Sequence, residues 1–187
     1  MAPLKRVYLA GPFFNEKQIE LIEKVETLLH AWNIQHFSPR KMTLNGNPTT
    51  SKPTPESAKQ IFKNDYHEIC NSTHVIAVID WALMPSTSLR IIKDSSMVTD
   101  EHVHGESRAT ILSGPIQIPD SGTVWEMGCA YALRVPVYLF TANPTSRLNL
   151  MLSQSARGVI YGFSHLENFL MNDMNEVLLE QWKGEHR

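Results

Sequence analysis

The residues whose types and spacing could do chemistry lie in one stretch, which reads DSGTVWE from Asp120 to Glu126. Short polar residues at its start are N-cap types, so a helix is predicted to begin here and to run to about Arg134. Gly122 leaves room for a ligand near the backbone. Glu126 would lie in the first turns, where free N–H groups and the helix dipole favour an ionised carboxylate. Such a carboxylate at the rim of a pocket can attack carbon as a nucleophile. The alternative is an ordinary glutamate beside an N-cap.

Strands and helices alternate along the rest of the chain, which predicts an α/β fold with a five-stranded parallel sheet between helices. Strands are expected at 6–11, 34–37, 74–79, 137–140 and 158–161, and helices at 15–32, 56–72, 120–134 and 166–182. The strand at 74–79 is nearly all apolar and β-branched, as expected for a strand covered on both faces. Gly128, Ala130 and Ala132 are expected to let the helix at 120–134 lie close against the sheet.

The carboxyl ends of the predicted strands supply further candidates, because open parallel sheets bind ligands outside those ends. Gly11, Phe13 and Phe14 follow the first strand and Asp80 follows the third. With Tyr8 of the first strand, the two phenylalanines could form an aromatic wall against a flat ligand, and plain core packing is the alternative. Neither G-x-G-x-x-G nor G-x-x-x-x-G-K-[ST] occurs, which disfavours dinucleotide and P-loop sites.

The size and composition of the chain suit a single domain covering residues 1–187. It has 187 residues, of which 42% are hydrophobic and 19% charged. The formal net charge of −2 argues against a nucleic-acid partner. No apolar run approaches the ~20 residues of a membrane span, so no membrane partner is expected.

The cysteines and histidines give no metal-binding pattern. Cys70 and Cys129 are expected to be reduced, buried thiols of a cytoplasmic protein, and the first residues lead into a strand rather than a signal peptide. His102 and His104 lie among acidic residues at a spacing that fits no defined site. A polar loop is therefore expected there, with no metal.

Residues 81–119 interrupt the alternation of strands and helices as a long insertion after the third strand. Loops of this length are usually functional lids or mobile segments. Both ends of the insertion lie at the proposed pocket. We therefore expect a partly mobile lid that influences which ligand is accepted.

Three motifs together resemble the nucleoside 2-deoxyribosyltransferase family. They read YLAGPFF from Tyr8, DSGTVWEMGCAYA from Asp120 and NLM from Asn149. The resemblance covers roughly 1–80 and 120–165, and the stretch 81–119 is longer than the family suggests. It implies a flavodoxin-like (Rossmann-like) sheet, homo-oligomers built from dimers, no cofactor, and exchange of the base between 2-deoxynucleosides and free nucleobases.

The resemblance also implies roles for single residues. Glu126 matches the family's nucleophile, and Tyr8 matches a tyrosine whose phenol lies beside it. Asp120 matches an aspartate that holds the sugar hydroxyls. Asp65 resembles a helix aspartate placed near the base. Breaking an N-glycosidic bond passes through an oxocarbenium-like state, which a carboxylate can stabilise and then trap as a covalent sugar. Exchange further requires a proton donor to the base and a site poor in activated water.

Asn149 and Met151 resemble residues lent to the site of a neighbouring subunit, with Asn149 at the sugar 5′ end. That position favours a nucleoside over the substrate of a related hydrolase, an N-glycosidase of 2-deoxynucleoside 5′-monophosphates. Ser153, Ser155 and Arg157 nearby keep the hydrolase open as an alternative. A nucleotide-binding sensor without turnover is a second alternative.

Overall fold

The computed structural model describes residues 5–44, 47–48, 54–80, 120–143, 149–176 and 179. The expected lid at 81–119, with His102 and His104, lies outside these residues. The elements follow in the order β1 (Arg6–Ala10), α1 (Glu16–Ala31), β2 (Gln35–Phe37), the 3-10 turn η1 (Pro39–Lys41), β3 (Thr43–Leu44), β4 (Asn47–Pro48), α2 (Pro55–Cys70), β5 (His74–Val78), α3 (Ser121–Ala132), β6 (Val137–Thr141), α4 (Leu150–Ser155), β7 (Gly158–Tyr161) and α5 (Gly162–Met171).

Five strands form one sheet in the order β2-β1-β5-β6-β7, and every pairing between neighbours is parallel. This confirms the predicted sheet, and the order is that of flavodoxin-like folds. The chain steps outward from β1 to β2 and then returns past β1 to β5. The direction of winding therefore reverses between β1 and β5, where sheets of this kind bind ligands beyond the carboxyl ends.

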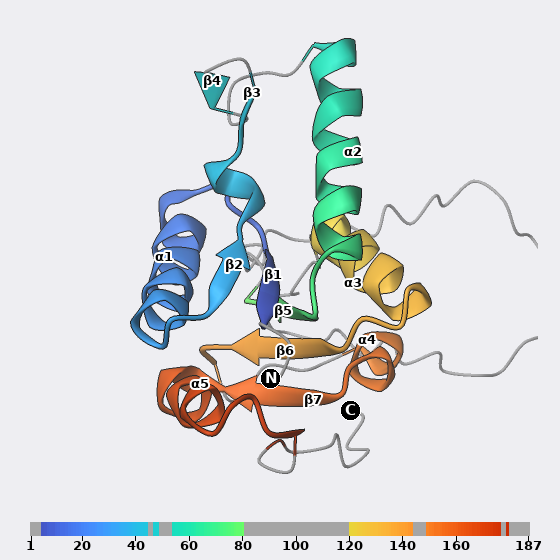
Figure 1. Cartoon of the computed structure of the whole chain (residues 1–187). Coiled ribbons are helices and arrows are strands. Elements are labelled where there is room, and N and C mark those ends of the chain that lie inside the picture. The colour runs from blue at the N-terminus through green and yellow to red at the C-terminus, as the bar shows by residue number, and fades with distance from the viewer. Residues whose placement is uncertain are drawn as a thin grey trace, which may run out of the picture. The chain divides into compact units, whose positions relative to one another are not determined.

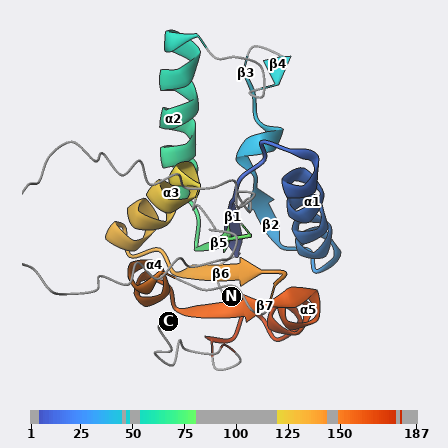
Figure 2. The same cartoon turned by 180° about the vertical axis from the view of Figure 1, so that it is seen from behind.

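Helices cover both faces of the sheet, α1 and α5 on one face and α2, α3 and α4 on the other (Figure 1; Figure 2 shows the same from behind). Successive side chains of a strand point to opposite faces, so each inner strand fills both cores. In β1, Val7 and Leu9 enter the core under α1 and α5. Tyr8 and Ala10 enter the core under the other three helices.

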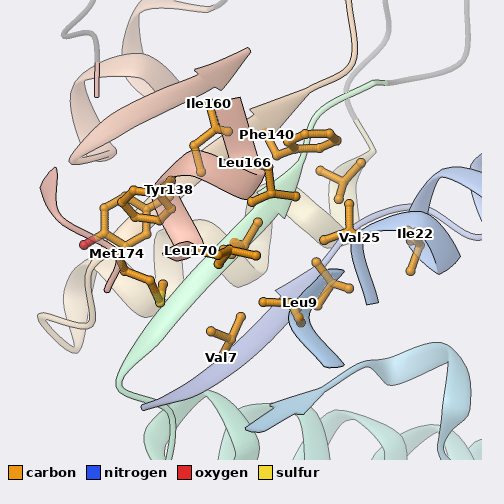
Figure 3. Packing of buried hydrophobic residues seen from close by; sticks show 14 of the residues in the cluster. Val7, Leu9, Ile22, Val25, Tyr138, Phe140, Ile160, Leu166, Leu170 and Met174 are labelled. Carbon is orange, nitrogen blue, oxygen red and sulfur yellow. The ribbon is translucent and has the colours of Figure 1, made fainter. Parts of the chain in front are cut away.

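Large side chains from strands and helices fill the core under α1 and α5 (Figure 3). The rings of Tyr138 and Phe169 meet edge to face with centroids 5.0 Å apart. The Tyr138 hydroxyl donates to Oε1 of Glu176 at 2.9 Å, so its buried polar group is satisfied. Burial of one such side chain contributes about 2–3 kcal/mol, which makes this core the main support of the sheet.

The helices that border the carboxyl ends of the strands begin at side-chain caps. Asn15 accepts from the Gln18 N–H at 3.0 Å, Thr54 from Ser57 at 3.2 Å, and Asp120 from Thr123 at 2.7 Å. Each cap satisfies an N–H that has no partner within its helix and stabilises the helix by about 1 kcal/mol. The predicted start of α3 at Asp120 is confirmed.

The closing helix is shorter and earlier than predicted. The apolar spacing predicts a helix over 166–182 with Ser164 as its cap, but α5 runs from Gly162 to Met171 and Ser164 lies inside it. Asp173 and Met174 have φ of 57° and 55°, a left-handed conformation that a right-handed helix cannot contain. The helix therefore stops before them, although Met174 continues the apolar pattern into the core.

Helix α2 buries much less than its apolar pattern predicts. Of the expected stripe Ala58, Ile61, Phe62, Ile69 and Cys70, only Ile69 is buried, whereas Phe62 is 54% exposed and the Cys70 thiol is exposed. Ile69 lies in the last turn, and only that turn contributes to a core. The preceding turns present their apolar side chains elsewhere, which bears on the candidate site.

Helix α3 also faces the sheet differently from its prediction. Met127 and Ala130 are buried against the sheet, whereas Gly128 and Ala132 face outward. Close packing on the sheet therefore depends on Ala130 and not on Gly128. None of the helices in the described ranges is long and apolar enough to cross a membrane.

Two glycines with opposite surroundings give a matched prediction about packing. A Cβ at Gly158 would lie 2.5 Å from Cβ of Leu179, so Gly158→Ala must displace that side chain from β7. We expect it to lower the free energy of unfolding by about 1–3 kcal/mol. Gly128 has nothing within 4 Å of such a Cβ, so Gly128→Ala should raise it by about 0.5–1 kcal/mol. Chemical denaturation of both variants measures this, and a neutral Gly158→Ala would contradict the packing of Leu179 on β7.

Candidate active site

One hydrogen bond joins the first strand to the helix that carries the candidate nucleophile. The Tyr8 hydroxyl donates to Oε1 of Glu126 at 2.6 Å. Tyr8 is fully buried and points from β1 toward α3 because even-numbered side chains of β1 face that side. The ring of Phe37, on β2, lies 5.7 Å from the Tyr8 ring and limits where the phenol can move. The two residues predicted to lie side by side do so.

Glu126 has a strongly perturbed carboxyl group. Its pKa is raised from 4.5 to about 8, mainly by burial. The hydrogen bond from Tyr8 opposes this rise, and the negative charges of Asp65 and Asp120 add to it. Glu126 is the sixth residue of α3, beyond the first turn where the dipole acts most strongly. The expectation that the helix start keeps this carboxylate ionised is therefore wrong for the free protein.

Tyr8 can only donate in this pair. Burial and the charge of Glu126 raise the pKa of the Tyr8 phenol well above its usual range. The phenol therefore keeps its proton at any ordinary pH and cannot act as a general base. Its position fixes one carboxyl oxygen of Glu126 and leaves the other to face a ligand.

Asp65, on α2, is the second perturbed carboxyl group. Burial, and after it the charge of Glu68, raises the pKa of Asp65 from 3.8 to about 6. Its Oδ1 is buried without a hydrogen-bond partner in the described part of the chain. A buried polar atom without a partner costs free energy, which a ligand atom could recover. A carboxyl group with a pKa near 6 can also accept and release a proton at neutral pH.

Asp65 and Glu126 line one hollow of about 480 Å³, whose walls come from α2 and α3. The remaining walls are Ala58, Ile61 and Phe62 from α2 and Gly122 and Trp125 from α3. The rings of Phe62 and Trp125 lie 5.0 Å apart. Aromatic and aliphatic walls with two carboxyl groups suit a flat, mainly apolar ligand with polar edges.

The start of α3 places Asp120 two residues before Gly122, which lines the same hollow. Oδ2 of Asp120 accepts from the Thr123 N–H at 2.7 Å and from the Thr123 hydroxyl at 2.6 Å. Gly122 lies so close to Asp120 that a Cβ there would be 3.3 Å from Oδ2. A side chain at this position would press on the cap, so the glycine preserves both the cap and the wall of the hollow.

Gly11 and Asp80 occupy the carboxyl ends of the two central strands. A Cβ at Gly11 would lie 3.0 Å from Cβ of Val78, so the close approach of the loop after β1 to β5 requires glycine. Asp80 accepts from the Thr141 hydroxyl at 2.9 Å and from the Ala142 N–H at 2.6 Å. Asp80 thus ties the end of β5 to the end of β6, and its predicted contact with substrate stays a prediction.

Phe13 and Phe14 do not line the hollow between α2 and α3. Their rings stack with centroids 5.6 Å apart. Phe13 packs against the core under α1 and α5, which is the other face of the sheet, and Phe14 is 74% exposed. Their predicted contact with a flat ligand is therefore not seen in the single chain and stays a prediction.

Asn149 and Met151 lie at the start of the short helix α4. Asn149 caps α4 by accepting from the Met151 N–H at 2.9 Å. Both side chains are exposed, Met151 to 74%, and neither lines the hollow. Their outward position is compatible with a role in a neighbouring subunit, which the single chain does not test.

Sequence reasoning missed the aromatic residues around the two carboxyl groups. Phe62 lies three residues before Asp65, so both share a helix face, but the apolar pattern placed Phe62 in the core. Trp125 directly precedes Glu126 and gave no signal of its own. Phe37 reaches Tyr8 only through the parallel pairing of β2 with β1. In the described ranges, Cys70 and Cys129 are free thiols, and no group of three or more His, Cys, Asp or Glu side chains is arranged to hold a metal ion.

Comparisons with known proteins bear on the family and the fold of the chain. A family model described as nucleoside 2-deoxyribosyltransferase matches residues 7–171. A solved 2-deoxyribosyltransferase from the psychrotolerant bacterium Bacillus psychrosaccharolyticus superposes with a TM-score of 0.64 at 25% identity, over 95% of this chain and 98% of that one. A conserved protein from Enterococcus faecalis V583 shares the fold, with a TM-score of 0.59 at 15% identity over 91% of this chain and 99% of that one. No curated protein sequence matches the chain.

The raised pKa of Glu126 predicts how the stability of the protein depends on pH. Because folding raises this pKa from 4.5 to about 8, the folded state binds the proton more tightly than the unfolded chain. The contribution is fully present below pH 4.5 and is lost as the pH rises through about 8. Glu126→Gln, which is always neutral and can still accept from Tyr8, should differ little from the wild type in melting temperature at pH 5, where most of the contribution is still present. At pH 9 it should melt on the order of 10 °C higher.

Calorimetry at the two pH values measures this difference. Glu167→Gln, at an exposed position on α5, is the control and should behave alike at both. An equal difference for Glu126→Gln at pH 5 and pH 9 would contradict the raised pKa.

Proposed function

The chain belongs to the nucleoside 2-deoxyribosyltransferase family and is therefore an enzyme that acts on N-glycosidic bonds, and we propose that it moves a 2-deoxyribosyl group from one nucleobase to another. The reaction runs by double displacement through a covalent sugar on Glu126. The observation that carries this proposal is the 2.6 Å hydrogen bond from Tyr8 to Glu126 at the base of a hollow that Asp65 also lines.

In the first half-reaction the Glu126 carboxylate attacks C1′ of the 2-deoxynucleoside. The C1′–O bond forms as the C1′–N bond breaks, and the electron pair of the broken bond passes to the base. A proton must reach the base nitrogen at the same time, since a neutral base leaves more easily than its anion. The phenol of Tyr8 holds one carboxyl oxygen of Glu126, so the other oxygen is directed at the sugar.

The perturbed carboxyl groups indicate where that proton comes from. In the free site Glu126, with a pKa of about 8, holds a proton at neutral pH and cannot attack. Asp65, with a pKa of about 6 and an unpaired Oδ1, is the group in the same hollow that can take this proton and pass it to the base. One proton shared by the pair then serves both the release of the nucleophile and the protonation of the base.

In the second half-reaction another base attacks C1′ of the covalent sugar and Glu126 leaves. The incoming base loses its proton to Asp65, and return of this proton to the Glu126 carboxylate restores the starting state. Transfer prevails over hydrolysis only if water reaches the sugar slowly. The aromatic walls formed by Phe62 and Trp125 support such exclusion when a base lies against them.

The site supports a nucleoside rather than a 5′-monophosphate as the substrate. Ser153 and Ser155 donate their hydroxyls to carbonyl oxygens of α4, to Leu150 at 2.9 Å and Leu152 at 2.9 Å. Arg157 precedes β7 and so lies at the amino end of a strand, away from the carboxyl ends where ligands bind. None of these three residues lines the hollow between α2 and α3, which weakens the hydrolase alternative.

Incubation of the protein with deoxyinosine and free adenine tests the function. We expect deoxyadenosine and hypoxanthine by chromatography. Glu126→Gln should lower the rate by several powers of ten without unfolding the protein, because the nucleophile is lost. Wild-type protein with deoxyinosine alone should show a deoxyribosyl adduct on Glu126 by mass spectrometry.

The other outcomes of this experiment distinguish the two alternative functions. Release of base without a new nucleoside would identify a hydrolase, and no turnover would support a sensor. Glu126→Gln within tenfold of the wild type would remove Glu126 from its role, with Glu167→Gln as the matched exposed control.

We further propose that the protein forms homo-oligomers whose sites are completed by a neighbour. Large apolar side chains stay exposed along the outer surfaces of α2, α3 and α4, at Phe62, Tyr66, Trp125, Tyr131, Leu150 and Met151. Exposure of this much apolar surface on one side of a domain usually marks an interface. Asn149 and Met151 lie within that surface, which supports their assignment to a partner's site.

Mixing two inactive variants tests the shared site. Asn149→Ser keeps an N-cap oxygen for α4 but shortens the side chain, so it should fold and lose most activity. Mixed with Glu126→Gln after mild dissociation, it should regain part of the activity, because one site per hybrid dimer is then complete. A fully active monomer in analytical ultracentrifugation would rule out shared sites.

A further inference from the structure

A cluster of charged side chains around one buried carboxylate lies outside the candidate site and has no role in the chemistry described so far. Glu26, on α1, is only 4% exposed. Its carboxylate accepts from Nε of Arg40 at 3.0 Å and from Nη2 at 2.6 Å, and it pairs with Nζ of Lys41 at 2.6 Å. Nη1 of Arg40 lies 3.3 Å from Glu23. Burial alone would raise the pKa of Glu26, but the bonds from Arg40, Lys41 and Ser38 outweigh it and hold this pKa below its ordinary value.

The cluster fixes the segment that follows β2. Arg40 and Lys41 belong to η1, which begins directly after the strand. The strand β2 has three residues and pairs with β1 alone in the described part of the sheet, so few backbone bonds hold its end. A carboxylate that binds both cations is therefore the main tie between this segment and α1. Loss of the carboxylate would leave two cations without their buried partner.

The segment reaches the active-site pair through Phe37. Phe37 ends β2, pairs with Tyr8 in the parallel register, and places its ring 5.7 Å from the Tyr8 ring. A shift of η1 moves Phe37 and so changes the packing of the phenol. The hydrogen bond from Tyr8 to Glu126 is 2.6 Å long, so a small displacement of either side chain weakens it.

A second path from the same segment leads to Asp65. Met42 follows η1 and is buried. Its sulfur accepts from Nδ2 of Asn64 at 3.6 Å, and Asn64 directly precedes Asp65 on α2. The segment therefore touches both elements that carry the partners of Glu126.

We propose that Glu26 is a positioning residue for the active site. By binding Arg40 and Lys41 it holds Phe37 against Tyr8 and Met42 against α2, and so maintains the Tyr8–Glu126 hydrogen bond. The inference rests on the proposed function of Glu126 and Tyr8. It gives Arg40, whose side chain is 16% exposed, a role in holding the segment after β2 to α1.

The experiment compares Glu26→Gln with the wild type in kcat, KM and the pH dependence of kcat/KM. The bond from Tyr8 lowers the pKa of Glu126, so a loosened bond raises this pKa and moves the basic limb of the profile, where the pair loses its shared proton, to higher pH. We expect a shift of about 0.5 pH unit, a fall in kcat of about tenfold and a KM within about twofold. Tyr8→Phe, which removes the bond itself, should show the same direction and a larger shift.

A purely structural role of Glu26 predicts a different result for the same variant. Glu26→Gln would then lower the melting temperature but keep the wild-type pH profile and kcat, and this result overturns the proposal. Glu20→Gln is the matched control, since it removes a 2.7 Å ion pair with Lys24 from the exposed face of the same helix. It should change neither profile nor kcat. If Glu26→Gln does not fold, Arg40→Lys is measured in its place. Lysine keeps the positive charge but cannot bind the Glu26 carboxylate through two nitrogen atoms, so the same shift and loss of kcat are expected.

A direct titration separates this proposal from the proposed function. The pKa of the Glu126 carboxyl group can be followed by carbon NMR in protein labelled at glutamate, without any turnover. A wild type with no exchange or hydrolysis would contradict the proposed function alone. A Glu126 pKa equal in wild type and Glu26→Gln would contradict the positioning role alone.

Discussion

A carboxyl group inside a protein stays in one orientation only if a neighbouring group binds it, and for Glu126 that group is the hydroxyl of Tyr8. The bond spans 118 positions of the sequence and joins the first strand, β1, to the helix α3. Three features maintain it: the pairing of β1 with β2 and β5, the cap at Asp120 that sets the start of α3, and Ala130, which lets α3 lie on the sheet. A change in any of them moves one partner relative to the other.

The same burial that orients Glu126 also opposes its charge. The folded chain favours the neutral acid, whereas attack on a sugar requires the anion. Asp65 resolves this conflict, because its pKa lies lower and its Oδ1 has no partner in the described residues. In the free site, the proton is therefore on Glu126, which must be ionised to attack, and Oδ1 of Asp65 has no hydrogen-bond partner in the described residues. A bound base removes both costs, so binding and chemistry favour each other.

Local signals in the sequence predict the sheet, its five parallel strands and the cap at Asp120, because apolar runs and N-cap residues act over a few positions. Long-range burial decides the rest. The apolar face of α2 was predicted as core, but an apolar spacing cannot distinguish a face packed on a sheet from one that lines a hollow, as Phe62 does. The ionisation of Glu126 depends on neighbours from β1 and α2. The end of α5 depends on Asp173 and Met174, which have positive φ, and no glycine or proline at these positions signals a helix end in the sequence.

The alternation of side chains along β1 has an evolutionary consequence. Val7 and Leu9 fill one core while Tyr8 faces the other. Insertion or deletion of one residue within this strand would exchange the two faces, bury the phenol among the aliphatic residues under α1, and leave Glu126 without its donor. Point substitutions can be absorbed on the exposed face of α1, where Glu20 and Lys24 lie. The length of β1 is therefore constrained by the candidate site as well as by the two cores.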